Sequence, residues 1–392
     1  MHIFSLNFFF FMLTNRIKHL ILLIIVFSLL ASIGLAVLIY LRSDELPTDE
    51  IRYARESLAA SREVRADIYA PALYIKAVSM YDSAMMVWQI ENQKWLLRRK
   101  FSEVIRLADT SAALAAEARH SAIILSKDAN STSASRLRDV ESRIARFEKV
   151  YVSLPLSEVL RNDFSRIKLM AEEIRIARSR QQFKKAIELL DTISMLMRKT
   201  ETAADRVVVD YFENFEAWEM LVKSEIERSK ANGKALLVVD KLSGKLLVYK
   251  NGKVKHTFPA EFGSNWLGDK LHQGDKATPE GSYNVTRKKE RGNTIYYKAL
   301  LLNYPNAEDL TRYQKNVSNG LIPAGIGAGN LIEIHGHGGR GYHWTDGCIA
   351  LADRDMDVVY GLSGLQTRVV VVGSTISYEE WYQNRLLDST TY

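Results

Sequence analysis

The hydrophobic pattern of the chain changes once, at Asn232-Gly233, and this change limits what the chain can fold into. Before it, from Thr48, apolar residues recur at spacings of three and four, the period of an amphipathic helix. After it come short runs rich in β-branched residues, with turn residues between them. The chain has 392 residues, enough for two folded units. We therefore expect an all-helical region at 47–232, a β domain at 233–373 and a tail at 374–392.

The helical region is expected to form antiparallel helices packed as a bundle or a hairpin array. Leu160–Ile174 and Phe183–Met197 each carry the helical period, and the polar residues Arg178–Gln182 between them predict a tight turn. The polar segment NSTSAS at 130–135 is expected to connect two further helices. No residue pattern in this region indicates chemistry. We expect a spacer, a surface for self-association, or a docking surface for an envelope protein.

The region after Gly233 is predicted to be mostly antiparallel, because few helical patterns separate its strands. Asn251-Gly252 lies between two β-rich runs and suits a type I′ turn, which predicts a hairpin. Asp353 is expected to cap a short helix that runs to Tyr360 and ends at Gly361. Strands are expected at 235–240, 245–250, 254–259, 281–287, 295–302, 331–334 and 368–372.

A long apolar run near the start of the chain predicts a membrane anchor at 1–46. Leu20–Leu41 contains no charged residue and is long enough to cross a bilayer. Arg16 and Lys18 precede the run and Asp44-Glu45 follow it, which favours a cytoplasmic N-terminus and a body outside the inner membrane. Phe8–Leu13 is expected to extend the anchor. A cleaved signal peptide is the alternative; the run is longer than an h-region of ~7–15 residues, and no small-x-small site closes it.

The overall charge bears on the class of partner. The net charge of +7 is spread along the chain, which suits an anionic surface such as membrane lipid or cell-wall polymer. No zinc-finger spacing, RNA-binding signature or block of basic residues indicates nucleic acid, so no nucleic-acid partner is expected.

One segment of twenty residues, Ile332–Leu351, gathers the groups that could do chemistry. It contains three of the eight histidines, His335, His337 and His343, and the only cysteine, Cys348. His335 ends one strand-like run and Cys348 begins another, with a glycine-rich loop between them. Two adjacent strand ends would hold the imidazole and the thiol within reach of each other.

This arrangement suits a cysteine nucleophile. A thiol with a pKa near ~8.5 is mostly protonated at neutral pH, and a paired histidine shifts it toward thiolate. Gly347 lets the backbone turn sharply, so that N–H groups of Gly347 and Cys348 can point at an oxyanion. The carbonyl of Gly336 could orient the imidazole. Three alternatives stay open: a buried structural cysteine, an inactive relative of an enzyme, and a zinc site built from His335, His337, His343 and Cys348, whose spacing matches no common motif.

The motif Ile334-His335-Gly336, followed by a loop and Thr345-Asp346-Gly347-Cys348, resembles the catalytic signature of YkuD-type L,D-transpeptidases. The similarity covers roughly Leu236–Gly373, and its other parts are VVDKLSGKLLVYKNGKV, Phe262-Gly263, the segment TPEGSY at 278–283 and the segment LNYPN at 302–306. The resemblance implies an α+β multidomain protein whose catalytic domain follows the helical region. It also implies that Cys348 is the nucleophile, His335 the base and Gly336 the orienting carbonyl, with no metal or organic cofactor.

The resemblance further implies a peptidoglycan stem peptide as substrate. A thioester acyl-enzyme would pass to an amine, giving a 3–3 cross-link or protein attachment, or to water, which makes the enzyme a carboxypeptidase or endopeptidase. The sequence departs from the best-known members, which have His where Asp346 stands and often Arg or Asn where Ala350 stands. This form resembles a divergent branch that includes hydrolases, and an inactive envelope scaffold is a further alternative. Substrate contacts are expected from Tyr304, His337, Arg340, His343, Thr345 and Asp346.

Overall fold

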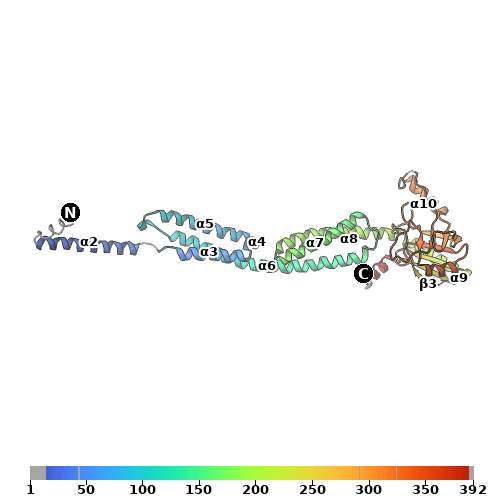
Figure 1. The fold of residues 1–392 in the computed structure, drawn as a ribbon, viewed down its shortest axis with the longest axis horizontal. Coiled ribbons are helices and arrows are strands. Elements are labelled where there is room, and N and C mark those ends of the chain that lie inside the picture. Colours follow the sequence, from blue (N-terminus) through green and yellow to red (C-terminus); the bar gives the residue numbers. More distant parts are fainter. Residues whose placement is uncertain (1–14, 43–44, 291, 324, 388–392) are drawn as a thin grey trace, which may run out of the picture. The chain divides into compact units, whose positions relative to one another are not determined.

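The computed structural model describes residues 15–42, 45–290, 292–323 and 325–387. It divides into two compact units at Ser133/Ala134, each described here by itself. The predicted fold class is confirmed: an apolar N-terminal helix, a helical region and a C-terminal sheet domain (Figure 1). The helices are α2 (Asn15–Arg42), α3 (Thr48–Glu63), α4 (Ala66–Tyr69), α5 (Pro71–Gln93), the 3₁₀ turn η1 (Leu96–Arg98), α6 (Ser102–Tyr151), α7 (Glu158–Ser179), α8 (Phe183–Phe212), α9 (Phe215–Asn232), α10 (Ala307–Ser318), α11 (Asp353–Leu362) and α12 (Tyr378–Leu387).

Helix α2 contains the apolar run. Its segment Ile17–Tyr40 is long and apolar enough to cross a membrane, with a mean hydropathy of 3.0, and none of it is buried against the rest of the protein. A signal sequence near the N-terminus has the same properties. The predicted extension at Phe8–Leu13 lies outside the described residues.

The first unit packs its helices through alanine. Short side chains let neighbouring helices approach closely, and Ala54, Ala77, Ala84, Ala108 and Ala118 are all fully buried between them.

Helix α6 continues through the segment at 130–135, so the predicted polar connector there is wrong. The hydroxyl of Ser131 donates to the carbonyl of Asp128 (3.2 Å) and that of Ser133 to the carbonyl of Asn130 (3.1 Å). Because these local bonds satisfy the polar side chains within the helix, the segment needs no loop.

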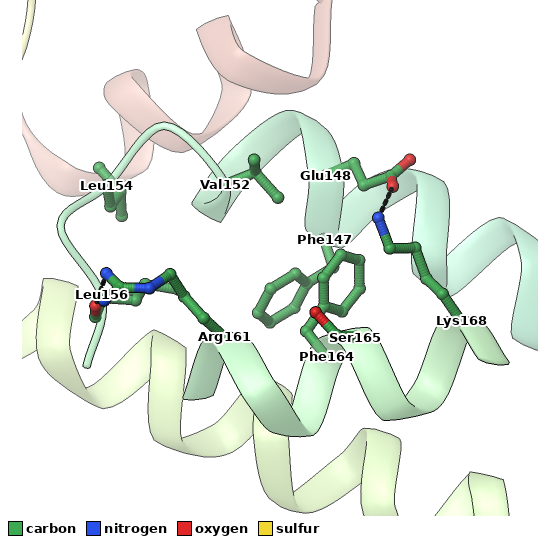
Figure 2. Close-up of a pocket in the computed structure, with 9 residues that line it drawn as sticks. All are labelled: Phe147, Glu148, Val152, Leu154, Leu156, Arg161, Phe164, Ser165 and Lys168. Carbon is green, nitrogen blue, oxygen red and sulfur yellow. Dashed lines mark hydrogen bonds and ion pairs between the residues drawn. The ribbon is translucent and has the colours of Figure 1, made fainter. Parts of the chain in front are cut away.

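In the second unit, α7 and α8 form the predicted antiparallel hairpin. The turn between them is the predicted one, with Gln181 in a left-handed conformation. The apolar stripes of both helices are buried, from Leu160 to Ile174 on α7 and from Ala186 to Met197 on α8. Between α6, α7 and their connecting loop lies a cavity of about 480 Å³, where the rings of Phe147 and Phe164 stack 4.3 Å apart (Figure 2).

The sheet domain contains one curled eight-stranded sheet in the order β3-β2-β1-β8-β4-β5-β6-β7. The pairs β1–β8 and β6–β7 are parallel and the others antiparallel, as a mostly antiparallel domain predicts. The predicted hairpin turn is confirmed, with φ of 53° at Asn251 and 72° at Gly252. The strands are β1 (Leu236–Asp240), β2 (Lys245–Lys250), β3 (Lys253–Pro259), β4 (Gly281–Lys289), β5 (Ala299–Leu302), β6 (Glu333–His335), β7 (Ile349–Ala350) and β8 (Arg368–Val372).

Three local predictions in the sheet domain are corrected. The strand expected from Ile295 begins only at Ala299, because the segment before it turns and places Tyr296 against a neighbouring ring. Asp353 does not cap α11: it is the first helical residue, and its side chain accepts the backbone N–H of His337 (2.7 Å). Gly361 lies inside α11, not after its end.

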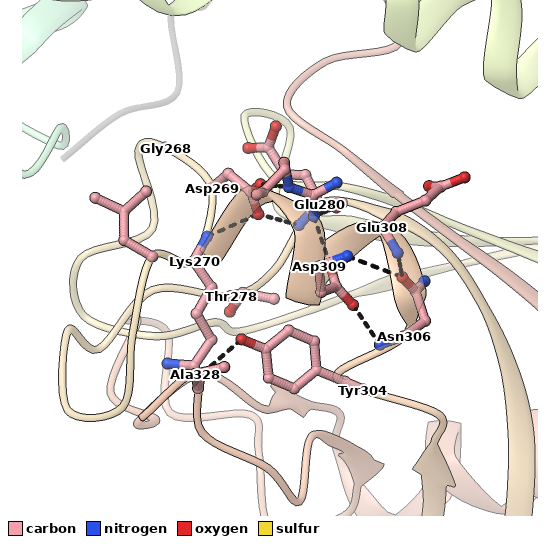
Figure 3. Close-up of polar contacts among 12 residues, drawn as sticks. Gly268, Asp269, Lys270, Thr278, Glu280, Tyr304, Asn306, Glu308, Asp309 and Ala328 are labelled. Carbon is pink, nitrogen blue, oxygen red and sulfur yellow. Dashed lines mark hydrogen bonds and ion pairs between the residues drawn. The ribbon is translucent and has the colours of Figure 1, made fainter. Parts of the chain in front are cut away.

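Helices α8 and α9 contact the sheet domain around a buried carboxylate, Glu280. It accepts hydrogen bonds from Tyr211 Oη (2.6 Å) and Trp218 Nε1 (3.1 Å), and it pairs with Lys241 Nζ (2.7 Å), which is fully buried. The backbone N–H of Glu280 donates to Asp269 (2.7 Å), which joins it to the polar network drawn in Figure 3. Helices α8 and α9 therefore complete the polar core of the sheet domain.

Residues 374–392, expected to form a tail, instead include α12. Trp381 on this helix is 4% exposed and its ring lies 6.1 Å from that of Phe212 on α8. The helix thus adds to the contact between the helical region and the sheet domain.

Candidate active site

Strands β6 and β7 bring the predicted histidine and cysteine to one face of the sheet. The two strands are parallel, with Ile334 opposite Ile349 and His335 opposite Ala350. Continued by one residue, this register places Cys348 beside Glu333. Because side chains alternate along a strand, Glu333, His335 and Cys348 share one face, while Ile334 and Ile349 are fully buried on the other.

His335 is held as a neutral imidazole with one free nitrogen. Its Nδ1 bonds the carbonyl oxygen of Gly336 (2.6 Å), the contact that the sequence predicts. A carbonyl only accepts, so Nδ1 carries the proton and the lone pair is on Nε2. The ring is fully buried, and Tyr296 stacks on it with the ring centroids 3.5 Å apart. Burial lowers the pKa of His335 to about 4, and Nε2 has no hydrogen-bond partner among the described residues.

Cys348 is half-buried, and its thiol donates to the carbonyl of Leu331 (Sγ–O 3.6 Å), not to His335. Leu331 is 60% exposed and has a φ of 59°, a left-handed conformation that is costly for leucine. Burial is the main cause that raises the pKa of the thiol to about 11, and the charges of Glu333 and Asp346 add to it. Burial therefore opposes the shift toward thiolate that the sequence analysis expects from a paired histidine.

The turn before the nucleophile is tight and specific to glycine. Gly347 has a φ of 132°, and a Cβ there would lie 2.7 Å from the carbonyl oxygen of Ala277. Thr345 Oγ1 donates to the carbonyl of Cys348 (2.7 Å) and accepts the N–H of Gly347 (3.2 Å). The N–H of Gly347 is thus engaged inside the turn and does not point toward a reacting group, contrary to expectation. Thr345 is buried and secures the turn.

The loop from Gly336 to Trp344 is fastened by a carboxylate that the sequence analysis missed. Glu261 accepts the N–H of Gly341 and the Nε1 of Trp344, each at 2.7 Å. Trp344 packs edge-on against His335, with centroids 6.0 Å apart, and carries the guanidinium of Arg340 on its face at 3.6 Å. Arg340 is exposed and lies close enough to be one of the charges that lower the pKa of His335.

The remaining predicted substrate residues lie in different settings. His343 is anchored inside the fold: it stacks on Phe262 (5.1 Å) and accepts that residue's N–H (3.0 Å), and burial lowers its pKa to about 4. His337 and Asp346 are exposed. Tyr304 is buried, and its hydroxyl donates to the carbonyl of Ala328 (2.8 Å; Figure 3).

The metal alternative receives no support from the described residues. Among them, no group of three or more His, Cys, Asp or Glu side chains is placed to hold a metal ion. The imidazole nitrogens of His335 and His343 bond different backbone groups, Gly336 and Phe262, instead of converging.

A cavity of about 690 Å³ lies beside the loop that carries these residues. Glu261, Tyr342 and His343 line it on the side of the sheet domain. The loop between α6 and α7, at 153–155, lines it on the other side, so the helical region contributes to the surroundings of this loop.

Besides Glu261, two features of the site were missed. Tyr296 lies in the segment at 295–302 for which the sequence analysis predicts a strand, and no sequence motif indicates that it stacks on His335. Lys289 Nζ pairs with Glu333 (2.6 Å) beside the thiol, although the two residues are 44 positions apart. Only the pairing of β4, β5 and β6 brings them together.

Comparison with known proteins relates the sheet domain to one enzyme family. Residues 234–371 match the family model of the L,D-transpeptidase catalytic domain, YkuD. The putative L,D-transpeptidase YafK of Escherichia coli K12 is 30% identical over 97 residues, which are 25% of this chain and 32% of that protein. The chain thus spans about a third of the length of the curated relatives it matches.

Solved structures that match part of this chain include Bd1075 of Bdellovibrio bacteriovorus, 19% identical over 40% of this chain and 55% of that one, with a TM-score of 0.28. An L,D-transpeptidase from Mycobacterium smegmatis is 16% identical over 35% of this chain and 58% of that one, with a TM-score of 0.23.

Proposed function

Because residues 234–371 match the family model of the YkuD L,D-transpeptidase catalytic domain, we propose that this chain transfers acyl groups from peptidoglycan stem peptides through Cys348. The observation that carries the proposal is the shared sheet face of Cys348 and His335, with the histidine tautomer set by the Gly336 carbonyl. A neutral imidazole whose Nε2 is free is the state a general base requires.

The reaction starts from a stem tetrapeptide that ends in D-alanine. The thiol turns from Leu331 toward His335, and Nε2 takes its proton while Sγ bonds the carbonyl carbon of the third, diamino acid residue. The C–N bond to D-alanine breaks, and the leaving amine takes the proton from His335. The result is a thioester on Cys348.

The acceptor then attacks the same carbonyl carbon. His335 takes a proton from the incoming amine or water, the new C–N or C–O bond forms, and the sulfur leaves and regains a proton. An amine gives a cross-link or an attached protein, and water gives a tripeptide. The raised pKa of the thiol and the lowered pKa of the imidazole both disfavour a resting thiolate–imidazolium pair, so we infer that proton transfer accompanies attack.

The pKa values make this step testable. Iodoacetamide reacts with the thiolate, so with the pKa of Cys348 raised to about 11 in the free protein, the rate of its alkylation in the absence of substrate rises through pH 7–9 without a plateau near neutrality. A preformed thiolate–imidazolium pair would instead give a rate that is already at its plateau at pH 7.

The acceptor is tested by incubating the protein with disaccharide tetrapeptide and analysing the products by mass spectrometry, beside Cys348→Ala. A dimer that has lost one D-alanine establishes transpeptidation, and tripeptide alone establishes hydrolysis. No product from this donor with the wild type, although Cys348 can be alkylated, would point to another wall linkage or to an envelope scaffold.

The cellular setting follows from the same proposal. Helix α2 anchors the chain in the inner membrane, and the sheet domain works outside it, where peptidoglycan lies. The helical region offers a surface for an envelope partner or a second copy. Processing by a signal peptidase would contradict the anchor, and the N-terminal sequence of the protein purified from membranes tests it.

A further inference from the structure

The face of the sheet that bears the nucleophile also carries an ion pair, whose position follows from strand register. Ala299 on β5 lies opposite both Lys289 on β4 and His335 on β6. Residues opposite each other across a sheet share a face, so Lys289, His335 and Glu333 face the same side as the thiol. Neighbouring strands are about 4.8 Å apart. Glu333 on β6 therefore lies next to Cys348, and Lys289 on β4 lies two strands beyond Glu333.

Lys289 reaches back over β5 to pair with Glu333, with Nζ and Oε1 2.6 Å apart. The methyl group of Ala299 leaves room for the lysine stem. The carboxylate side chain is 8% exposed and the lysine side chain 17%. The pair therefore places one positive and one negative charge in a largely water-free environment, with its carboxylate on the strand next to the attacking sulfur.

Neither stability nor nucleophilicity explains this pair. A buried ion pair is seldom more stabilising than an apolar pair of similar size, because both ions lose hydration. The charge of Glu333 also opposes ionisation of the neighbouring thiol and helps raise its pKa. The presence of a carboxylate that raises the pKa of the nucleophile is understandable if that carboxylate binds a part of the substrate.

We propose that Glu333 and Lys289 bind the zwitterionic end of the diamino acid side chain in the donor stem, Glu333 its ammonium and Lys289 its carboxylate. This inference rests on the proposed function, since the acylated carbonyl belongs to that same residue. The side chain of the diamino acid starts at the α-carbon next to the carbonyl that Cys348 attacks. Strand β6, which carries Glu333, lies about one side-chain length from Cys348, so the end of the diamino acid side chain can reach the ion pair. When the ligand binds, its ammonium takes the place of Lys289 beside Glu333, and its carboxylate takes the place of Glu333 beside Lys289. Each protein charge therefore keeps an opposite charge next to it.

Matched donors separate the two contacts. Disaccharide tetrapeptides with diaminopimelate, with lysine, and with diaminopimelate amidated at its distal carboxylate share the ammonium but differ in the anion. The wild type is expected to favour the diaminopimelate donor about ten- to a hundredfold in kcat/KM over the other two. Lys289→Met lowers kcat/KM for that donor and removes the preference, whereas Glu333→Gln lowers kcat/KM for all three.

Two further variants guard against a purely structural role. Lys255→Met removes an exposed cation on β3, at the opposite edge of the sheet, and is expected to behave as the wild type. The swap Glu333→Lys/Lys289→Glu restores a merely structural ion pair but places the charges wrongly for the ligand, so the preference stays lost. Circular dichroism confirms that each variant is folded.

The outcomes are distinct. Equal kcat/KM of the wild type for the three donors, or a swap that restores the diaminopimelate preference, would overturn the inference and leave the proposed function intact. No turnover of any donor by the wild type would overturn the proposed function itself.

Discussion

Replacing Gly347 with alanine tests whether the turn before Cys348 is as constrained as its geometry indicates. At a φ of 132° a side chain costs about 1–3 kcal/mol in backbone strain. The added Cβ would also lie 2.7 Å from the carbonyl oxygen of Ala277, a backbone atom that must shift. Overpacking of this kind costs about 1–3 kcal/mol. We expect a total loss of about 2–4 kcal/mol, because the two strains are relieved in part by the same shift.

Gly361→Ala is the matched control. This glycine lies within α11, and a Cβ there would meet nothing within 4 Å. Alanine is favoured over glycine by about 0.5–1 kcal/mol in a helix interior and by less at the next-to-last position, so this variant should be at least as stable as the wild type. Urea unfolding of the full chain in detergent, followed by tryptophan fluorescence, gives both midpoints. Equal midpoints for the two variants would refute the argument about Gly347.

Three further predictions concern the docked helices, the histidines and the loop arginine. Glu280→Ala leaves the buried ammonium of Lys241 without its carboxylate partner and should cost about 3–5 kcal/mol in unfolding free energy, against about 1 kcal/mol for Tyr211→Phe, both measured by urea unfolding. Equal small losses would contradict the central role of Glu280 in this contact. Burial lowers the pKa of His335 from 6.5 to about 4, so the unfolded chain binds a proton in this window that the folded chain does not. Stability should therefore fall as pH falls from 6.5 to 4, and His335→Gln should reduce that slope in urea midpoints measured across the window; an unchanged slope would contradict it. Arg340→Ala should raise KM about tenfold for a donor with a free terminal carboxylate, in a steady-state assay, if this exposed guanidinium binds it; an unchanged KM would remove that role.

Much of the fold could be predicted because its signals are local. The helical stripes of α7 and α8, the Asn251-Gly252 turn and strand β8 each depend on a few consecutive residues, and the structure confirms them. The segment at 130–135 was wrongly predicted to be a connector because its serine hydroxyls donate to backbone carbonyls of the same helix, which composition alone does not reveal.

The candidate site was predictable only along its own segment. His335, Gly336 and Cys348 lie within fourteen residues and form a recognisable pattern. Glu261, Lys289 and Tyr296 come from elsewhere in the chain and reach the site through strand pairing and loop packing.

The protonation state of the thiol was also beyond the sequence. It depends first on burial and then on the charge of Glu333, which comes next to the thiol only through the pairing of β6 with β7.

The most direct test of the central claim is the search for the thioester itself. The protein is incubated with disaccharide tetrapeptide, quenched in acid and digested, and the peptide that contains Cys348 is analysed by mass spectrometry. The account predicts an adduct of the donor minus D-alanine on Cys348 that hydroxylamine removes, and much less of it in His335→Ala. Turnover of the donor at the wild-type rate by Cys348→Ala would contradict the account.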